Sequence, residues 1–210
     1  MAKKKVRFEA SAHLQRLIGR DLIPNDEMAI VELVKNAYDS GAKHVHIYIQ
    51  PETAKEPGLI RISDDGSGMS EDGVTILFMF AGYSQRPDEV AKADRVPTGE
   101  KGIGRFAADK LGETLNVYTK TARSREGLRL TINWRDFENR LKKFNEVEAT
   151  YQASPVPGLG LRDSGTALEI TGLRARWEAD KLASLKTDLS DLLNPYARPK
   201  NFEITIEVAG

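Results

Sequence analysis

Apolar residues recur every three or four positions along residues 26–40, which is the spacing of one face of an α-helix. Asn25 or Asp26 is suited to cap the start of this helix, and Gly41 is suited to end it. The same pattern, in weaker or shorter form, predicts further helices at 13–20, 71–81, 103–111 and 178–193. Most of the predicted helices therefore lie early in the chain.

Alternating apolar and polar residues mark the strands. We expect strands at 44–49, 59–63, 115–119, 128–134, 167–171 and 202–208, with a short edge strand at 6–9. Prolines with charged residues or glycines predict loops at 84–98 and 154–165. Because the strands come late and adjacent, the predicted fold class is α+β. We expect a two-layer α/β sandwich whose mixed, mainly antiparallel sheet carries helices on one face.

The composition narrows the class of protein. A chain of 210 residues can bury a sizeable core as a single domain, and its zero net charge gives no argument for nucleic acid or an anionic membrane. The lack of cysteine excludes disulfides and thiolate chemistry, and three scattered histidines form no metal-binding pattern. The sequence has neither a signal peptide nor an apolar run of membrane-spanning length, which favours a cytoplasmic location. Because the chain stops directly after a strand, we expect residues 1–210 to be the N-terminal part of a longer protein.

The predicted helix at 26–40 carries a polar stripe. Glu32, Asn36 and Asp39 occupy positions i, i+4 and i+7, so their side chains share one face. The apolar positions are Ile30, Val31, Leu33, Val34, Ala37 and Tyr38. Taken alone, this pattern is that of an amphipathic helix with a solvated polar face.

Acids and glycines follow the predicted strand at 59–63, in the string Asp64-Asp65-Gly66-Ser67-Gly68-Met69. Glycines allow positive φ angles and a close approach of a flat ligand to the backbone. The Asp64 carboxylate could accept a hydrogen bond from an exocyclic amine such as that of adenine. The alternative is an ordinary Asp-Gly turn between strands.

The second glycine-rich string, Gly99-Glu100-Lys101-Gly102-Ile103-Gly104, opens a predicted helix. Backbone N–H groups at a helix start favour phosphate, and Lys101 could add a positive charge. The sequence contains no Gly-Lys-Ser/Thr string, so a P-loop is excluded. A dinucleotide-binding motif is disfavoured because this string follows a charged loop and not a strand. Ser164-Gly165-Thr166 is a weaker signal, since such a turn before a strand is common.

The chain resembles the GHKL ATPase superfamily in four motifs, in order and in spacing. They are Glu32-x-x-x-Asn36-Ala37-x-Asp39, Asp64-x-Gly66-x-Gly68, Gly99-x-x-Gly102-x-Gly104 and Gly165-Thr166. The superfamily includes DNA gyrase B, the ninety-kilodalton heat-shock chaperone, sensor histidine kinases and MutL. The resemblance spans about 12–208 and implies the Bergerat type of α/β sandwich.

The resemblance also implies a site for ATP and Mg²⁺. Asn36 would hold Mg²⁺, Asp64 would bond the adenine amino group, and Thr166 would support adenine through water. The residues that would complete the nucleotide site are Asp39, Gly66, Gly68, Met69, Gly99, Lys101, Gly102, Ile103 and Gly104. Residues 84–98 would form the lid over ATP.

Glu32 separates the branches of the superfamily. It resembles the general base of the gyrase, chaperone and MutL branch, so we expect slow ATP hydrolysis by this domain alone. A histidine-kinase-type catalytic domain and a non-hydrolysing ATP sensor remain alternatives. The resemblance further implies a nucleotide-driven switch or clamp, with an ATP-dependent homodimer through the N-terminal region. Further domains beyond Gly210 would supply an extra cation and decide the nucleic-acid or client partner, which the sequence leaves unknown.

Overall fold

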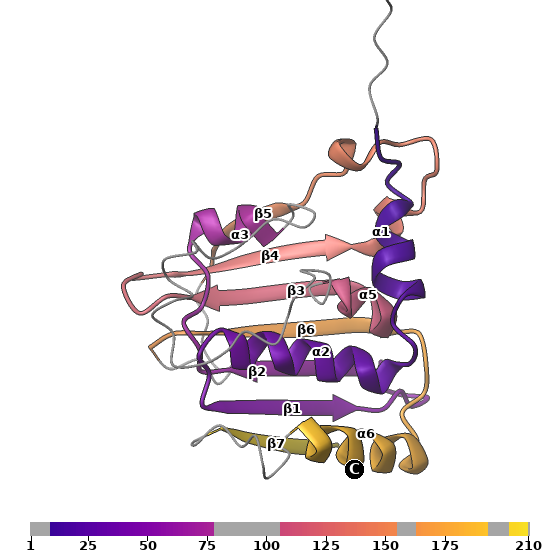
Figure 1. The fold of residues 1–210 in the computed structure, drawn as a ribbon, viewed down its shortest axis with the longest axis vertical. Coiled ribbons are helices and arrows are strands. Elements are labelled where there is room, and N and C mark those ends of the chain that lie inside the picture. Colours follow the sequence, from indigo (N-terminus) through magenta and orange to yellow (C-terminus); the bar gives the residue numbers. More distant parts are fainter. Residues whose placement is uncertain (1–8, 78–105, 155–162, 193–201, 210) are drawn as a thin grey trace, which may run out of the picture.

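The computed structural model describes residues 9–77, 106–154, 163–192 and 202–209 (Figure 1). Its centre is a seven-stranded sheet with the order β5-β4-β3-β6-β2-β1-β7. The strands are β1 His44–Gln50, β2 Leu59–Asp64, β3 Gly112–Lys120, β4 Gly127–Asn133, β5 Thr150–Ser154, β6 Gly165–Leu173 and β7 Glu203–Val208. Strands β1 and β7 pair in parallel, and the other neighbouring strands pair antiparallel. The predicted mixed, mainly antiparallel sheet is therefore confirmed.

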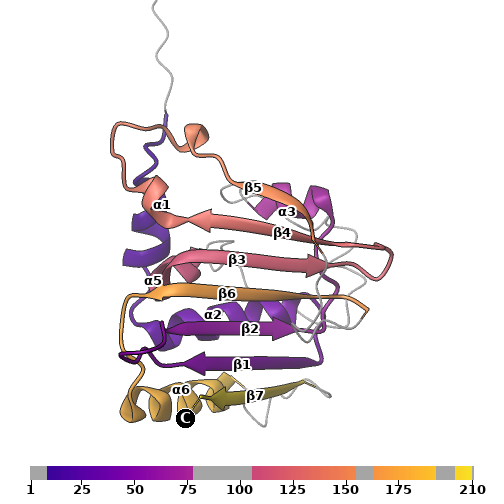
Figure 2. The ribbon, with the colours of Figure 1, turned by 180° about the vertical axis from the view of Figure 1, so that it is seen from behind.

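The larger helices cover one face of this sheet, and the view from behind shows the strands uncovered (Figures 1 and 2). The α-helices are α1 Leu14–Arg16, α2 Asp26–Asp39, α3 Glu71–Leu77, α5 Ala108–Leu111 and α6 Ala179–Leu192. Shorter turns are the π-helical η1 Leu17–Asp21 and the 3-10 turns η3 Trp134–Phe137 and η4 Phe144–Glu146. None of the helices in the described ranges is long and apolar enough to cross a membrane.

Helix α2 begins and ends where the sequence predicts. The Asn25 side chain accepts a hydrogen bond from the Met28 backbone N–H at 2.8 Å, which satisfies a donor that the first turn leaves without a helical partner. Gly41 follows the helix with a φ of 84°, the left-handed conformation that suits a helix end. The helix buries its apolar side against the sheet and leaves Asn36 exposed.

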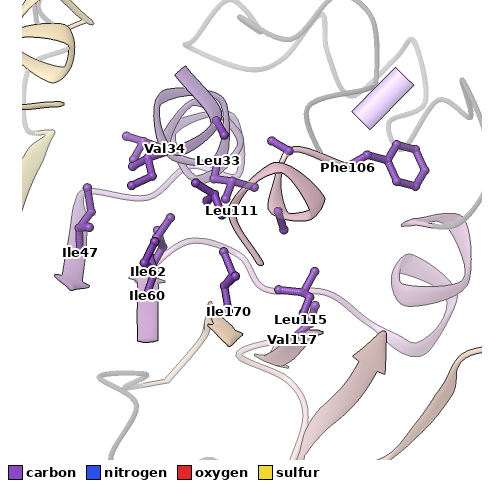
Figure 3. Close-up of a cluster of buried hydrophobic side chains, with 14 of the residues drawn as sticks. Leu33, Val34, Ile47, Ile60, Ile62, Phe106, Leu111, Leu115, Val117 and Ile170 are labelled. Atoms are coloured by element: carbon purple, nitrogen blue, oxygen red, sulfur yellow. The ribbon is translucent and has the colours of Figure 1, made fainter. Parts of the chain in front are cut away.

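The core lies between this helix layer and the sheet (Figure 3). Strand alternation turns Ile47, Ile60 and Ile170 toward the helix layer that contains Val34 of α2, and all four side chains are fully buried. Burying an aliphatic side chain of this size contributes about 1.5–3 kcal/mol. The sandwich is thus stabilised mainly by the residues whose periodicity predicts the elements.

Several boundaries differ from the sequence predictions. Strand β5 was not predicted, because its residues are mostly exposed and its alternation is limited to Tyr151 and Ala153. Pairing with β4 forms it, and the Tyr151 hydroxyl donates to Glu71 of α3 at 2.7 Å. The loop predicted at 154–165 was wrong at both ends, since Ser154 belongs to β5 and Gly165 to β6. Trp134 leaves β4 and begins η3. The predicted strand at 6–9, apart from Glu9, and the loop at 84–98 lie outside the described residues.

A buried acid, Asp109, joins several elements at the end of the sheet where β6 ends. Asp109 of α5 has no exposed surface and receives hydrogen bonds from Arg20, Arg174 and Gln15. The shortest joins Arg20 Nη2 to Asp109 Oδ1 at 2.7 Å. Although burial lowers the pKa of Arg20, Asp109 and Glu138 raise it above its usual value. The guanidinium therefore stays charged, and the cluster ties η1, α5 and the end of β6 together.

Candidate functional site

The candidate site lies where α2, β2 and β3 end and β6 begins, at the left of Figure 1. Two contacts hold the end of α2 against the turn that follows β2. The Ser67 backbone N–H donates to the Ser40 carbonyl at 3.0 Å. A Cβ at Gly66 would lie 2.0 Å from Ser40 Oγ, so only glycine lets the two segments approach this closely. The structure therefore brings together the first and second of the motifs.

Three neighbouring strands place side chains next to one another at this end of the sheet. Asp64 of β2 pairs with Thr166 of β6, and Thr166 pairs with Thr119 of β3. The Thr119 and Thr166 hydroxyl oxygens lie 3.2 Å apart. Because paired residues of adjacent strands point to the same face, all three side chains point to the helix-covered face. The sheet register thus joins the second and fourth motifs.

Asp64 is held in a partly desolvated place. Loss of solvent raises the pKa of Asp64 to about 6, and the negative charge of Asp65 acts in the same direction. The backbone N–H groups of Gly66 and Thr166 donate to the carboxylate and oppose the rise, the first at 2.8 Å to Oδ1. At neutral pH the group is therefore a fixed, mostly ionised acceptor.

Asp65 fixes the turn from the other side. Its Oδ1 accepts the backbone N–H groups of Lys43 and His44, at 2.7 and 2.8 Å, and its Oδ2 lies 2.6 Å from His44 Nδ1. Partial burial pushes the pKa of Asp65 upward, but these hydrogen bonds outweigh it and hold the pKa below its usual value. The carboxylate therefore fastens the end of β2 to the start of β1, beside Asp64.

Gly68 and Met69 complete the turn. Gly68 has a φ of 65°, and a Cβ there would lie 1.9 Å from the Lys120 carbonyl oxygen. The Met69 backbone N–H donates to Thr119 Oγ1 at 2.7 Å. Contacts within the protein thus already require glycine at position 68, and at position 66 a larger residue would displace the Ser40 side chain. A close approach of a ligand to these glycines stays a prediction.

The polar stripe of α2 lies on the turns that lead to this site. Glu32 is partly exposed, and its Oε1 accepts a hydrogen bond from Lys35 Nζ at 2.6 Å. Asn36 has an exposed side chain, one turn before Ser40. Asp39 is half-buried at the last residue of the helix. Helix α2 carries Glu32 toward the site, about two turns before the end of the helix.

The third motif falls outside the described residues. Gly99, Lys101, Gly102, Ile103 and Gly104 therefore remain sequence predictions, as does the lid at 84–98. The described chain resumes at Phe106, and α5 spans Ala108–Leu111 within the helix predicted at 103–111. Among the residues that the structure does describe, no cluster of three or more His, Asp or Glu side chains could hold a metal ion.

Sequence reasoning missed Thr119 and the role of Asp65. Thr119 lies at the end of a strand whose apolar alternation reads Leu115, Val117 and then Thr119. The available signal was the polar Thr119, which stands at the strand end where the alternation predicts another apolar residue. The partner strand could not be identified from the sequence, because β6 follows β3 at a distance and β4 comes between them in the chain.

The fold and the site together define a class of protein. It is a two-layer α/β sandwich with an acid and two hydroxyl groups at one end of its sheet. The profile of the histidine kinase-, DNA gyrase B- and HSP90-like ATPases matches residues 25–166. The chain belongs to this family of ATPases. The matched range begins at the cap of α2 and ends at Thr166, so it contains every motif described above.

The chain is also similar to individual proteins. The chain is 28% identical to a putative type II restriction enzyme, HgiDII, of Herpetosiphon aurantiacus, over 95% of this chain and 31% of that protein. It is 27% identical to the mitochondrial TNF receptor-associated protein 1 homolog of Dictyostelium discoideum, over 57% of this chain and 20% of that protein. The DNA mismatch repair protein MutL of Azorhizobium caulinodans is 32% identical over 36% of this chain and 12% of its own length. The chain thus spans less than a third of each relative.

Proposed function

We propose that this chain binds ATP at the end of the sheet and hydrolyses it to ADP and phosphate. The observation that carries the proposal is the placement of Asp64 beside Thr166, under the end of α2, in a chain of an ATPase family. Asp64 is ionised at neutral pH and held by two backbone N–H groups. It is therefore an acceptor of fixed position for the amino group of adenine.

Hydrolysis requires a group that takes a proton from the attacking water. Glu32 is the residue of the stripe suited to this role, because a carboxylate can accept that proton as the water oxygen bonds to the γ-phosphorus. The bond from the γ-phosphorus to the bridging oxygen then breaks, and ADP leaves. Lys35 occupies Oε1 of Glu32, so Oε2 is the oxygen that we assign to the water.

The donor chemistry of the stripe fits Mg²⁺. The ion prefers oxygen ligands and keeps several waters when it also binds phosphates, so a single exposed amide oxygen such as that of Asn36 is a suitable protein ligand. When bound, Mg²⁺ supplies positive charge to the phosphate oxygens. Lys101 and the glycines of residues 99–104 would add donors to the same oxygens.

ATP binding would act as a conformational switch. In this proposal the nucleotide orders the lid at 84–98 and favours a homodimer through the N-terminal region. Domains outside residues 1–210 would receive the signal, and a nucleic acid or a client protein would be its target. The domain organisation and the cytoplasmic location stay predictions from the sequence.

Isothermal titration calorimetry of Mg-ATP with wild type and Asp64→Asn tests the site. The asparagine keeps the size of the side chain but presents an amide in place of a carboxylate. Since a hydrogen bond to a charged group contributes about 1.5–3 kcal/mol, we expect the affinity to fall about 10- to 100-fold. The matched control is Asp180→Asn, an exposed acid in the first turn of α6, which should bind like wild type. Equal affinity in Asp64→Asn removes this residue from the site.

A second candidate function is ATP sensing without turnover. The specific observation that favours it is the 2.6 Å ion pair of Glu32 with Lys35, which engages the carboxylate that hydrolysis needs. A histidine-kinase-type catalytic domain is the remaining alternative from the sequence. ATP binding is common to all three functions, so a hydrolysis measurement is needed to separate them.

A further inference from the structure

We propose that Thr119 is a positioning residue that fixes the Thr166 hydroxyl as a hydrogen-bond acceptor and so makes the site select adenine over guanine. The inference rests on the proposed function, because it needs a purine base next to Asp64 and Thr166. It adds a residue that lies outside all four sequence motifs and explains how a neutral hydroxyl can contribute to base selection.

Thr119 is 1% exposed and has three polar neighbours. The Met69 backbone N–H lies 2.7 Å from its Oγ1, the Gly165 carbonyl oxygen 3.1 Å, and the Thr166 hydroxyl oxygen 3.2 Å. A threonine hydroxyl has one hydrogen to donate and two lone pairs to accept with. The three contacts therefore use its whole hydrogen-bonding capacity.

The direction of each hydrogen bond follows from the partners. The Met69 N–H can only donate, so it occupies one lone pair of Thr119. The Gly165 carbonyl can only accept, so it takes the Thr119 hydrogen. The contact with Thr166 then has a hydrogen between the two oxygens only if Thr166 donates to Thr119. The opposite direction would leave the Thr119 oxygen against the Gly165 oxygen without a hydrogen between them, which is costly in a buried place.

The consequence is that Thr166 presents lone pairs, and no hydrogen, to a ligand. The carboxylate of Asp64 on the neighbouring strand is also an acceptor. Two acceptors side by side match the amino group of adenine, which can donate twice, directly or through a water. Guanine has a carbonyl oxygen at that position, and an acceptor facing two acceptors loses its hydrogen bonds on leaving water.

The test is the ratio of the GTP to the ATP dissociation constants, measured by calorimetry in wild type, Thr119→Val and Thr119→Ser. Valine removes the acceptor for the Thr166 hydrogen, so the hydroxyl can turn and donate. We expect the ratio to fall at least about tenfold, the equivalent of about 1.4 kcal/mol. Serine keeps the hydroxyl and should restore the ratio. Thr119→Val also removes the acceptor for the Met69 N–H. This loss should weaken the binding of both nucleotides alike and leave the ratio unchanged.

Thr166→Val tests the same proposal without altering Thr119, so it decides the matter even if Thr119→Val fails to fold. Thr166→Val should lower the ratio by itself. When Thr119→Val is added to Thr166→Val, the ratio should change no further. An unchanged ratio in Thr166→Val overturns the proposal, as does a shift by Thr119→Val that persists without the Thr166 hydroxyl. A wild-type chain that binds ATP without preference over GTP also overturns it. A wild-type chain that binds neither nucleotide refutes the proposed function itself.

Discussion

The ionisation of Asp64 depends on its surroundings. This residue lies at the end of a buried strand, where loss of solvent raises its pKa to about 6 although two backbone N–H groups donate to it. A ligand amine that donates to the carboxylate favours the ionised form. Nucleotide binding and proton release at Asp64 are therefore linked, and ATP affinity should decline as the pH falls through 6.

The carboxyl carbon of Asp64 can report this linkage by ¹³C nuclear magnetic resonance. We expect a titration near pH 6 in the free protein. With ATP bound, the pKa should fall by about one unit or more, which corresponds to about 1.4 kcal/mol of preference for the ionised form. Asp64→Asn identifies the signal. A pKa that nucleotide leaves unchanged would show that the adenine amine does not bind there, and titration at the ordinary value of an aspartate would contradict the desolvation.

At the scale of elements, α5 depends on a buried charge for its position. Asp109 is fully buried, whereas Arg20 and Arg174 are 15% and 21% exposed. The three groups join η1, α5 and the end of β6.

Asp109→Asn should lower the free energy of unfolding by about 3 kcal/mol, because two partly buried guanidinium groups lose their counter-charge. Urea unfolding measures this change. Glu113→Gln is the matched control, since its ion pair with Arg135 lies on the surface and should contribute little. A value for Asp109→Asn within about 0.5 kcal/mol of wild type, as for an ordinary surface change, would contradict the role of the cluster.

The elements also show which parts of the molecule the sequence could predict. Helix α2 and strands β1 and β2 were predicted nearly to the residue, because local periodicity and caps determine them. Strand β5 and the Thr119–Thr166 contact depend on strand order, which local patterns do not contain. The motifs predicted the positions of Asp64 and Thr166 in sequence, but the hydrogen-bond partners that fix them required the structure.

At the scale of the whole molecule, the sheet acts as the frame of the site. Its order places β6 between β2 and β3, so Thr119 and Asp64 lie on either side of Thr166, which is 47 positions after Thr119 and 102 after Asp64 in sequence. The helices cover the face of the sheet to which these side chains point. Helix α2 carries the polar stripe to the end of the sheet where they lie. The ATPase family, the fixed carboxylate of Asp64 and the carboxylate of Glu32 on the adjoining helix together support the proposed hydrolysis of ATP.

Single-turnover hydrolysis of labelled ATP, with protein in excess and Mg²⁺ present, tests this central claim most directly. Glu32→Gln keeps the shape of the side chain but cannot take the proton from water, and general-base catalysis contributes about 10²- to 10⁴-fold to rate. The account predicts that this variant binds ATP like wild type and hydrolyses it at least about 100-fold more slowly, while the control Asp180→Asn, at an exposed acid of α6, keeps its activity. Hydrolysis by Glu32→Gln at the wild-type rate, with ATP still bound, would contradict it.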